Sequence, residues 1–140
     1  MTSCFKLLLV LLTLVPTATT NATLRGWTDS QCLATAIHYE ARGEPLKGRR
    51  AVLDTIHNRM LATGKSACYV IFQRGQFSWA NKKPLMPYNS GQKAMLEEVV
   101  TYPIVLRNEQ HKFFYSGEKP QWAKGMKCRK IGNQNFCEGK

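Results

Sequence analysis

The spacing of apolar and polar residues along the chain predicts a helix over residues 27–40, WTDSQCLATAIHYE. Four positions at i, i+3, i+4 and i+7 share one face of this helix: Leu33, Ala36, Ile37 and Glu40. Thr28 is the expected N-cap, and Gln31, three residues later, completes a capping box with it. The apolar face of the predicted helix therefore ends in a carboxylate.

A loop and a second helix follow. Residues 41–48, ARGEPLKG, predict an irregular turn in which Pro45 offers a start for the next helix. That helix is expected over residues 49–64. Its apolar stripe consists of Leu53, Ile56 and Met60. Gly64 is the expected C-cap, because glycine readily takes the left-handed conformation that ends many helices.

Farther along, residues 67–79 are apolar and aromatic, and their period does not distinguish a strand from a short helix. A third helix is expected over residues 91–102, capped by Ser90 and ended by Pro103. The segment CRKIGNQNFC at residues 128–137 predicts a β-hairpin. These elements indicate a mainly helical α+β fold, as a small single domain with a short C-terminal β-hairpin.

The first 22 residues differ in composition from the rest and predict a signal peptide. Lys6 precedes an apolar run, and the small residues up to Ala22 suit a cleavage site. The run is short for a membrane span, and an uncleaved anchor is the alternative. The mature domain is then residues 23–140, exported across the cytoplasmic membrane to the periplasm or cell wall.

The cysteines agree with export. Loss of the signal peptide removes Cys4 and leaves four cysteines, and an even number in a small exported domain predicts two disulfides. A two-residue turn at Gly132-Asn133 places Cys128 opposite Cys137, in a non-hydrogen-bonded pair whose side chains lie close together. The predicted disulfides are therefore Cys128–Cys137 and, by elimination, Cys32–Cys68.

The formal net charge of +11 bears on the choice of partner. Scattered lysines and arginines favour a polyanion, through Coulomb attraction and counterion release. Export disfavours nucleic acid as that polyanion and favours an anionic bacterial cell envelope. We expect the protein to be a monomer.

Glu40 is the candidate catalytic residue. Burial on an apolar face and the negative end of the helix dipole both disfavour a charged carboxylate, so the pKa of Glu40 is expected to be raised. A carboxyl group that stays protonated near neutral pH can donate a proton to a leaving oxygen, as in glycosidases. The alternative is an exposed glutamate that pairs with Arg42 or Lys47.

Three segments occur in order along the chain: YEARGEPLKGRRAVLDTIHNR, VIFQRGQFSW and KPQWAKGMKCRKIGNQNFC. Together they resemble the signature blocks of the cell-wall hydrolase family that includes the spore-cortex-lytic enzymes, in which phage lysis proteins also occur. The resemblance covers residues 30–137 and implies a lysozyme-like fold. It also implies a peptidoglycan substrate, cleaved in its glycan strands at the β-1,4 bond between N-acetylmuramic acid and N-acetylglucosamine.

The resemblance assigns roles to residues. Glu40 corresponds to the catalytic glutamate that ends the first helix, and Glu44 matches a second acid that either takes part in chemistry or supports the loop. The expected substrate-binding residues are Tyr39, Gln76, Ser78 and Trp79. A place in the core is an equal alternative for Trp79. Core packing or buried structural contacts are the expected roles of Phe77, Asn58 and Arg59.

Two reactions at this bond are open. Hydrolysis generally needs two carboxyl groups, about 5–5.5 Å apart for retention or about 6.5–9.5 Å apart for inversion. Asp29 lies about 16 Å from Glu40 at helical rise, which is too far for a second carboxyl group. The sequence does not place Asp54. Glu44 is therefore the candidate for the second acid that lies close to Glu40 in sequence. A lytic transglycosylase uses one glutamate as acid and then as base, while the C6 hydroxyl group of the substrate attacks. Transglycosylation is slightly favoured.

Two other classes of protein are the alternatives. A non-enzymatic basic protein, which binds the envelope or inhibits lysozyme, would explain the charge and the disulfides but not YEARGE together with QFSW. A metal-dependent cell-wall amidase would need clustered ligands. The three histidines His38, His57 and His111 are isolated, and neither HExxH nor CxxC occurs, so we expect no metal and no cofactor.

Overall fold

The computed structural model describes residues 27–107 and 110–139, and the expected signal peptide lies outside these residues. Helices come first and a three-stranded antiparallel sheet follows: α1 (Asp29–Ala41), α2 (Leu46–Thr63), α3 (Ala67–Phe72), α4 (Ser90–Thr101), β1 (His111–Ser116), the 3₁₀ turn η2 (Gln121–Ala123), β2 (Cys128–Ile131) and β3 (Gln134–Glu138). The predicted mainly helical α+β class is confirmed. No described helix combines the length and the apolar character that a membrane span requires.

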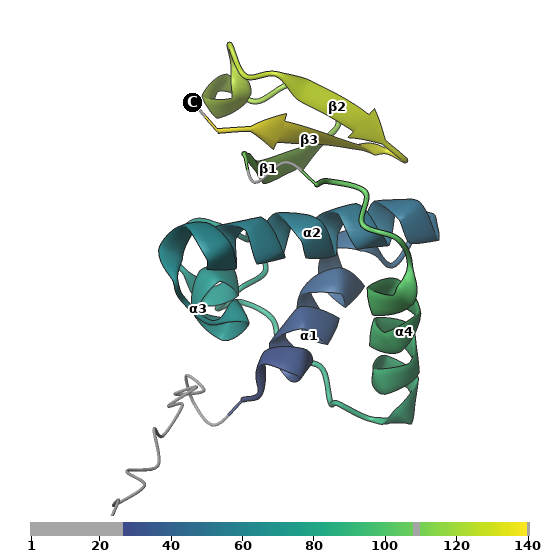
Figure 1. The fold of residues 1–140 in the computed structure, drawn as a ribbon. Helices are drawn as coiled ribbons and strands as arrows, with labels where there is room; N and C mark the ends of the chain where they lie inside the picture. Colours follow the sequence, from purple (N-terminus) through teal and green to yellow (C-terminus); the bar gives the residue numbers. More distant parts are fainter. Residues whose placement is uncertain (1–26, 108–109, 140) are drawn as a thin grey trace, which may run out of the picture.

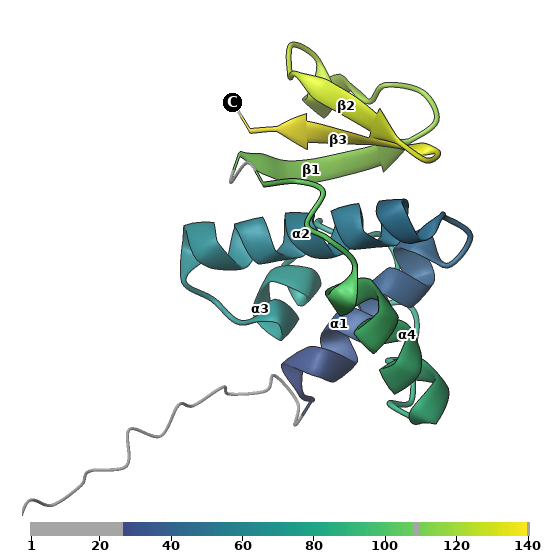
Figure 2. The same cartoon turned by 45° about the vertical axis from the view of Figure 1, so that its right-hand side comes forward.

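The second helix is the centre of the domain. The sheet lies along one side of α2, while α1, α3 and α4 lie on the other side (Figure 1). A view turned by 45° shows the same two layers on either side of α2, with β1 as the strand nearest to it (Figure 2). Residues 50–56 of α2 are all buried as a result. The apolar stripe predicted for α2 therefore describes only part of its buried surface.

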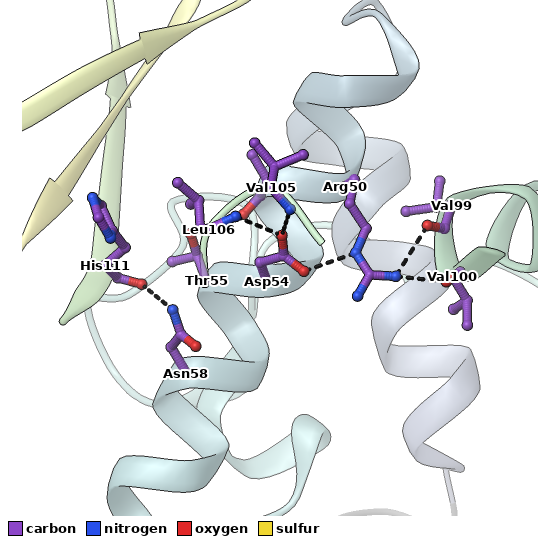
Figure 3. Close-up of polar contacts among 10 residues, drawn as sticks. Arg50, Asp54, Thr55, Asn58, Val99, Val100, Val105, Leu106 and His111 are labelled. Carbon is purple, nitrogen blue, oxygen red and sulfur yellow. Dashed lines mark hydrogen bonds and ion pairs between the residues drawn. The ribbon is translucent and has the colours of Figure 1, made fainter. Parts of the chain in front are cut away.

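Helix α2 carries charged residues into this interior, where they form a buried ion pair with further hydrogen bonds to the backbone (Figure 3). Arg50 Nε donates to Asp54 Oδ1 at 2.7 Å, and Arg50 Nη1 donates to the carbonyl oxygen of Val100 at 2.6 Å. The other carboxylate oxygen of Asp54 accepts from the amides of Val105, at 2.7 Å, and Leu106, at 3.0 Å. Both charges are thus matched, and they attach α2 to the end of α4 and to the segment that leads into β1.

The first helix begins as predicted. Thr28 is its N-cap and accepts from the amide of Gln31 at 3.2 Å. The predicted capping box is only half formed, because the side chain of Gln31 donates to the carbonyl oxygen of Met86 at 3.2 Å. That contact attaches the start of α1 to the loop before α4. A full capping box would instead need the side-chain oxygen of Gln31 to accept from the amide of Thr28.

The starts of two other helices differ in detail from the prediction. Helix α2 begins at Leu46 with Pro45 as its N-cap, three residues earlier than expected, and Gly64 ends it in the left-handed conformation. The cap of α4 is Asn89 and not Ser90, because the Asn89 side chain accepts from a backbone amide of the first turn. The undecided segment 67–79 opens with the short helix α3.

The C-terminal hairpin has the predicted register. Its four cross-strand pairs are Ile131 with Gln134, Lys130 with Asn135, Arg129 with Phe136, and Cys128 with Cys137. The third strand, β1, was not predicted, and it pairs with the edge of β3 opposite to β2, which gives the order β1-β3-β2. Every residue of β1 except the last is half-buried, so the segment lacks the alternation that marks a strand.

Both predicted disulfides are confirmed. Cys32–Cys68 joins α1 to α3 with a Cα–Cα distance of 5.3 Å. Cys128–Cys137 crosses the β2–β3 hairpin with a Cα–Cα distance of 4.1 Å. One bridge therefore stabilises the start of α1, and the other stabilises the hairpin that packs against its end.

Candidate active site

Glu40 lies at the C-terminal end of α1, where its carboxyl group is half-buried. The indole Nε1–H of Trp79 donates to Glu40 Oε1 at 2.7 Å. Burial raises the pKa of Glu40 above its ordinary value, and the hydrogen bond from Trp79 acts in the opposite direction because it favours the charged form. Burial is the larger effect, so the predicted rise in the pKa of Glu40 is confirmed.

The carboxyl group faces an open cleft with a volume of about 590 Å³. The cleft is lined by residues from α1, α2, the loop after α3, β1 and the segment around η2: Glu40, Arg59, Gly75, Gln76, Phe77, Ser78, Phe113, Phe114, Trp122 and Met126. Among the described residues, Glu40 is the one carboxylate in this lining. The arrangement therefore presents a single acid to whatever occupies the cleft.

The lining of the cleft combines polar groups with aromatic rings. Glu40, Gln76 and Ser78 supply polar groups on the helical side. On the sheet side, Trp122 is 45% exposed, and its ring centroid lies 6.0 Å from that of Phe113. Exposed flat apolar surface beside hydrogen-bonding groups is what a sugar-binding site requires. The prediction missed Trp122, although it lies in the third segment that resembles the family.

Arg59 is the second charged residue of the cleft. It reaches the cleft from α2 and donates through Nη2 to Gln76 Oε1. Its guanidinium carbon lies 5.6 Å from the ring centroid of Phe77 and 5.4 Å from that of Phe113. Burial lowers the pKa of Arg59 to about 10, so the side chain remains a cation at neutral pH. We expected only a structural contact from Arg59, and the structure adds exposure to the cleft.

The four predicted substrate-binding residues divide into two pairs. Gln76 and Ser78 line the cleft together with Glu40. Trp79 is 6% exposed and packs in the core, where its ring centroid lies 4.9 Å from that of Tyr39. The Tyr39 hydroxyl donates to the carbonyl oxygen of Pro84 at 2.8 Å. Neither ring contributes to the lining, and Trp79 instead orients the carboxyl group of Glu40.

Glu44 contacts the C-terminal hairpin. Its Oε2 accepts from the amide of Asn133 at 3.0 Å, and the neighbouring Gly132 leaves the space that Oε2 occupies. Beside this contact, Gln134 Nε2 donates to the backbone carbonyl of Glu40 at 2.9 Å. The hairpin turn is therefore attached both to the loop after α1 and to the last turn of the helix that carries Glu40.

The two aspartates considered as second acids are engaged elsewhere. Asp29 Oδ1 accepts from the amide of Cys68 at 3.2 Å, and Asp54 forms the buried ion pair with Arg50. Neither lines the cleft. Within residues 27–107 and 110–139, no three His, Cys, Asp or Glu side chains are grouped so that they could hold a metal ion.

Comparisons with known proteins identify a family and a fold. The family described as Cell Wall Hydrolase matches residues 43–137, a range that begins just after Glu40 and includes Arg59, Gln76 and Trp122. No significant match is found among curated protein sequences.

Two solved structures have a similar fold. The catalytic domain of the germination-specific lytic transglycosylase SleB from Bacillus anthracis has a TM-score of 0.65 and 24% identity, over 81% of this chain and 98% of that chain. The catalytic domain of the Bacillus cereus SleB protein has a TM-score of 0.61 and 24% identity, over 81% of this chain and 93% of that chain. The fold is therefore that of these catalytic domains.

Proposed function

The chain belongs to the Cell Wall Hydrolase family, and from this premise we propose that it cleaves the glycan strands of peptidoglycan. The bond is the β-1,4 linkage between N-acetylmuramic acid and N-acetylglucosamine. The observation that carries the proposal is the half-buried carboxyl group of Glu40 beside an open cleft with an exposed tryptophan. The activity named for the similar SleB fold, lytic transglycosylation, supports the same choice.

Glu40 is the proposed general acid and base. Its protonated carboxyl group donates a proton to the glycosidic oxygen, and the bond between that oxygen and C1 of the muramic residue breaks. The C6 hydroxyl group of the same residue attacks C1, closes a 1,6-anhydro ring and gives its proton to the Glu40 carboxylate. Glu40 ends the cycle protonated, as it began, and the attack benefits from being intramolecular.

Transglycosylation is preferred over hydrolysis because, among the residues that the structure describes, no second carboxylate lines the cleft. Hydrolysis generally requires a second carboxyl group within about 10 Å that faces the same bond. Glu44, the nearest candidate in sequence, binds the amide of Asn133 and does not line the cleft. We assign to Glu44 the support of the hairpin, and to Trp79 the orientation of Glu40.

The proposed site of action is outside the cytoplasm, at the cell wall. The two disulfides fit an oxidising compartment. The net charge of +11 supplies attraction to the anionic wall, so salt is expected to release the protein from isolated walls. If the amount of protein bound to isolated walls did not change with salt concentration, the net charge would not be the cause of binding.

The test is digestion of purified peptidoglycan followed by mass spectrometry of the products. Anhydro-muramic ends are expected, whereas reducing muramic ends would mean hydrolysis and cut peptides would overturn the proposal. Glu40→Gln is expected to reduce turnover by about a hundred- to ten-thousand-fold, the usual contribution of general-acid catalysis. Glu44→Gln is the matched control, since it changes a neighbouring glutamate that does not face the cleft, and it is expected to keep most of the activity.

A further inference from the structure

Two arginines of α2, the buried Arg50 and the half-buried Arg59, differ in how completely they are paired. An arginine has five N–H donors and remains charged when buried. Arg50 donates to Asp54 and to the carbonyl oxygens that end α4, so its charge is matched inside the protein. Arg59 donates to Gln76 Oε1, a neutral acceptor, and it forms no ion pair with any residue that the structure describes.

Arg59 also faces the cleft, which Arg50 does not. The guanidinium carbon of Arg59 lies over the rings of Phe77 and Phe113, at 5.6 and 5.4 Å from their centroids. These contacts hold the planar group in a fixed place, and they leave donors unused. A held guanidinium group with unused donors matches a carboxylate, which it can bind through two parallel hydrogen bonds.

From this geometry, and on the basis of the proposed function, we infer that Arg59 binds a carboxylate of the muramic acid residue or of its peptide. The two β-1,4 linkages of a glycan strand have nearly the same chemistry, because every second sugar differs only by a lactyl group and the peptide attached to it. A cleft with uncharged groups would discriminate poorly between these linkages. A cation that binds a carboxylate on every second sugar places the correct linkage at Glu40.

The carboxylate has two possible sources. The lactyl group carries a free carboxylate where the peptide has been removed. Where the peptide is present, that carboxyl group forms an amide, and the carboxylates belong to the peptide itself. The recognised chemistry is the same in both cases, and suitable ligands distinguish the two sources.

The experiment measures binding by calorimetry in a Glu40→Gln background, so that the ligand is not consumed. The three ligands are chitotetraose, a peptide-free tetrasaccharide of alternating N-acetylglucosamine and N-acetylmuramic acid, and the same tetrasaccharide with L-alanyl-D-isoglutamate on each lactyl group. Arg59→Met is expected to weaken binding of a carboxylate-bearing ligand by about ten- to a hundred-fold, the range for a hydrogen bond to a charged group. Binding of chitotetraose is expected to stay the same.

A loss confined to the peptide-free ligand identifies the lactyl carboxylate, and a loss confined to the dipeptide ligand identifies the peptide. Arg129→Met is the matched control, because it removes one positive charge from an exposed position on β2. An equal loss in that control, or an equal loss for chitotetraose, would overturn the inference, as would unchanged affinity for all three ligands. Failure of Glu40→Gln to bind any glycan would overturn the proposed function together with the inference.

Arg59→Lys separates the geometry of the group from its charge. Lysine keeps the positive charge but cannot form two parallel hydrogen bonds, so it is expected to restore only part of the lost affinity. Circular dichroism and melting curves establish that each variant is folded. If lysine restored the affinity in full, the positive charge alone would explain carboxylate binding, and the two parallel hydrogen bonds would be refuted.

Discussion

The hydrogen bond from Trp79 to Glu40 leads to a prediction about the pH dependence of catalysis. Trp79→Phe keeps an aromatic ring in the core but removes the indole N–H that donates to Glu40 Oε1 at 2.7 Å. That bond favours the charged form of Glu40, so its removal raises the pKa of Glu40 further. Because the acid must be protonated to act, the alkaline limb of the activity profile is expected to move to higher pH.

The size of the effect follows from the bond. A hydrogen bond to a charged group contributes about 1.5–3 kcal/mol, which is about a ten- to a hundred-fold change in the proton affinity of Glu40. We expect the lower end of this range, because Glu40 is half-buried and water replaces part of the lost interaction. The smaller ring also leaves space in the core, so the plateau of activity and the melting temperature are both expected to fall.

The assay is the pH profile of kcat/KM on soluble glycan strands, since this quantity reports the ionisation of the free enzyme. Trp27→Phe is the matched control, because Trp27 packs on Phe72 in the same core at 5.0 Å and does not contact Glu40. The control is expected to lower stability and leave the alkaline limb in place. An alkaline limb that stays put or moves to lower pH in Trp79→Phe would refute the assigned role of Trp79.

Three further predictions concern stability. The raised pKa of Glu40 gives the wild type stability that is fully present below the ordinary carboxyl pKa and is lost as pH rises through the folded-state value. Glu40→Gln is therefore expected to raise the melting temperature more at neutral than at acidic pH, and a gain independent of pH would contradict this. Asp54→Asn is expected to cost about 3–5 kcal/mol in denaturant titrations, because it leaves Arg50 buried without its counter-charge; a cost below about 1 kcal/mol, typical of surface changes, would count against the buried pair. Gly132→Ala is expected to cost more in the wild type than in a Glu44→Ala background, because its Cβ would overlap Glu44 Oε2. Equal losses of stability in the two backgrounds of this double-mutant cycle would show that overlap with Glu44 does not cause the loss.

The features that could be predicted from the sequence are those that neighbouring residues determine. The register of the hairpin follows from the turn at Gly132-Asn133, and the disulfide at its open end requires the same register. The rise in the pKa of Glu40 follows from the apolar face of its own helix. In both cases the necessary partners are close in sequence, or they are specified by a periodic pattern.

The features that were missed depend on tertiary contacts. The segment that forms β1 is half-buried on both faces because it lies between α2 and β3, so it shows no alternation. Arg59 looked like a core residue, since only the meeting of α2 with the loop at Gln76 and with β1 brings its guanidinium group to the cleft. Likewise, the N-cap of α4 shifted by one residue because Asn89 and Ser90 are both good caps, and local preference does not choose between them.

The residues that line the cleft come from parts of the chain that are far apart in sequence. Glu40 and Ser78 belong to the helical half, and Phe113 and Trp122 belong to the segment from β1 to η2. The hydrogen bonds to Glu40 come from Trp79 and from Gln134, beside the hairpin turn. Exposed positions in the segment from β1 to η2, such as Trp122, can therefore change, in nature or in a laboratory library, without altering the hydrogen bonds to Glu40. The residues that hold the acid and the exposed residue that a polymer would meet are therefore different, and they can change independently.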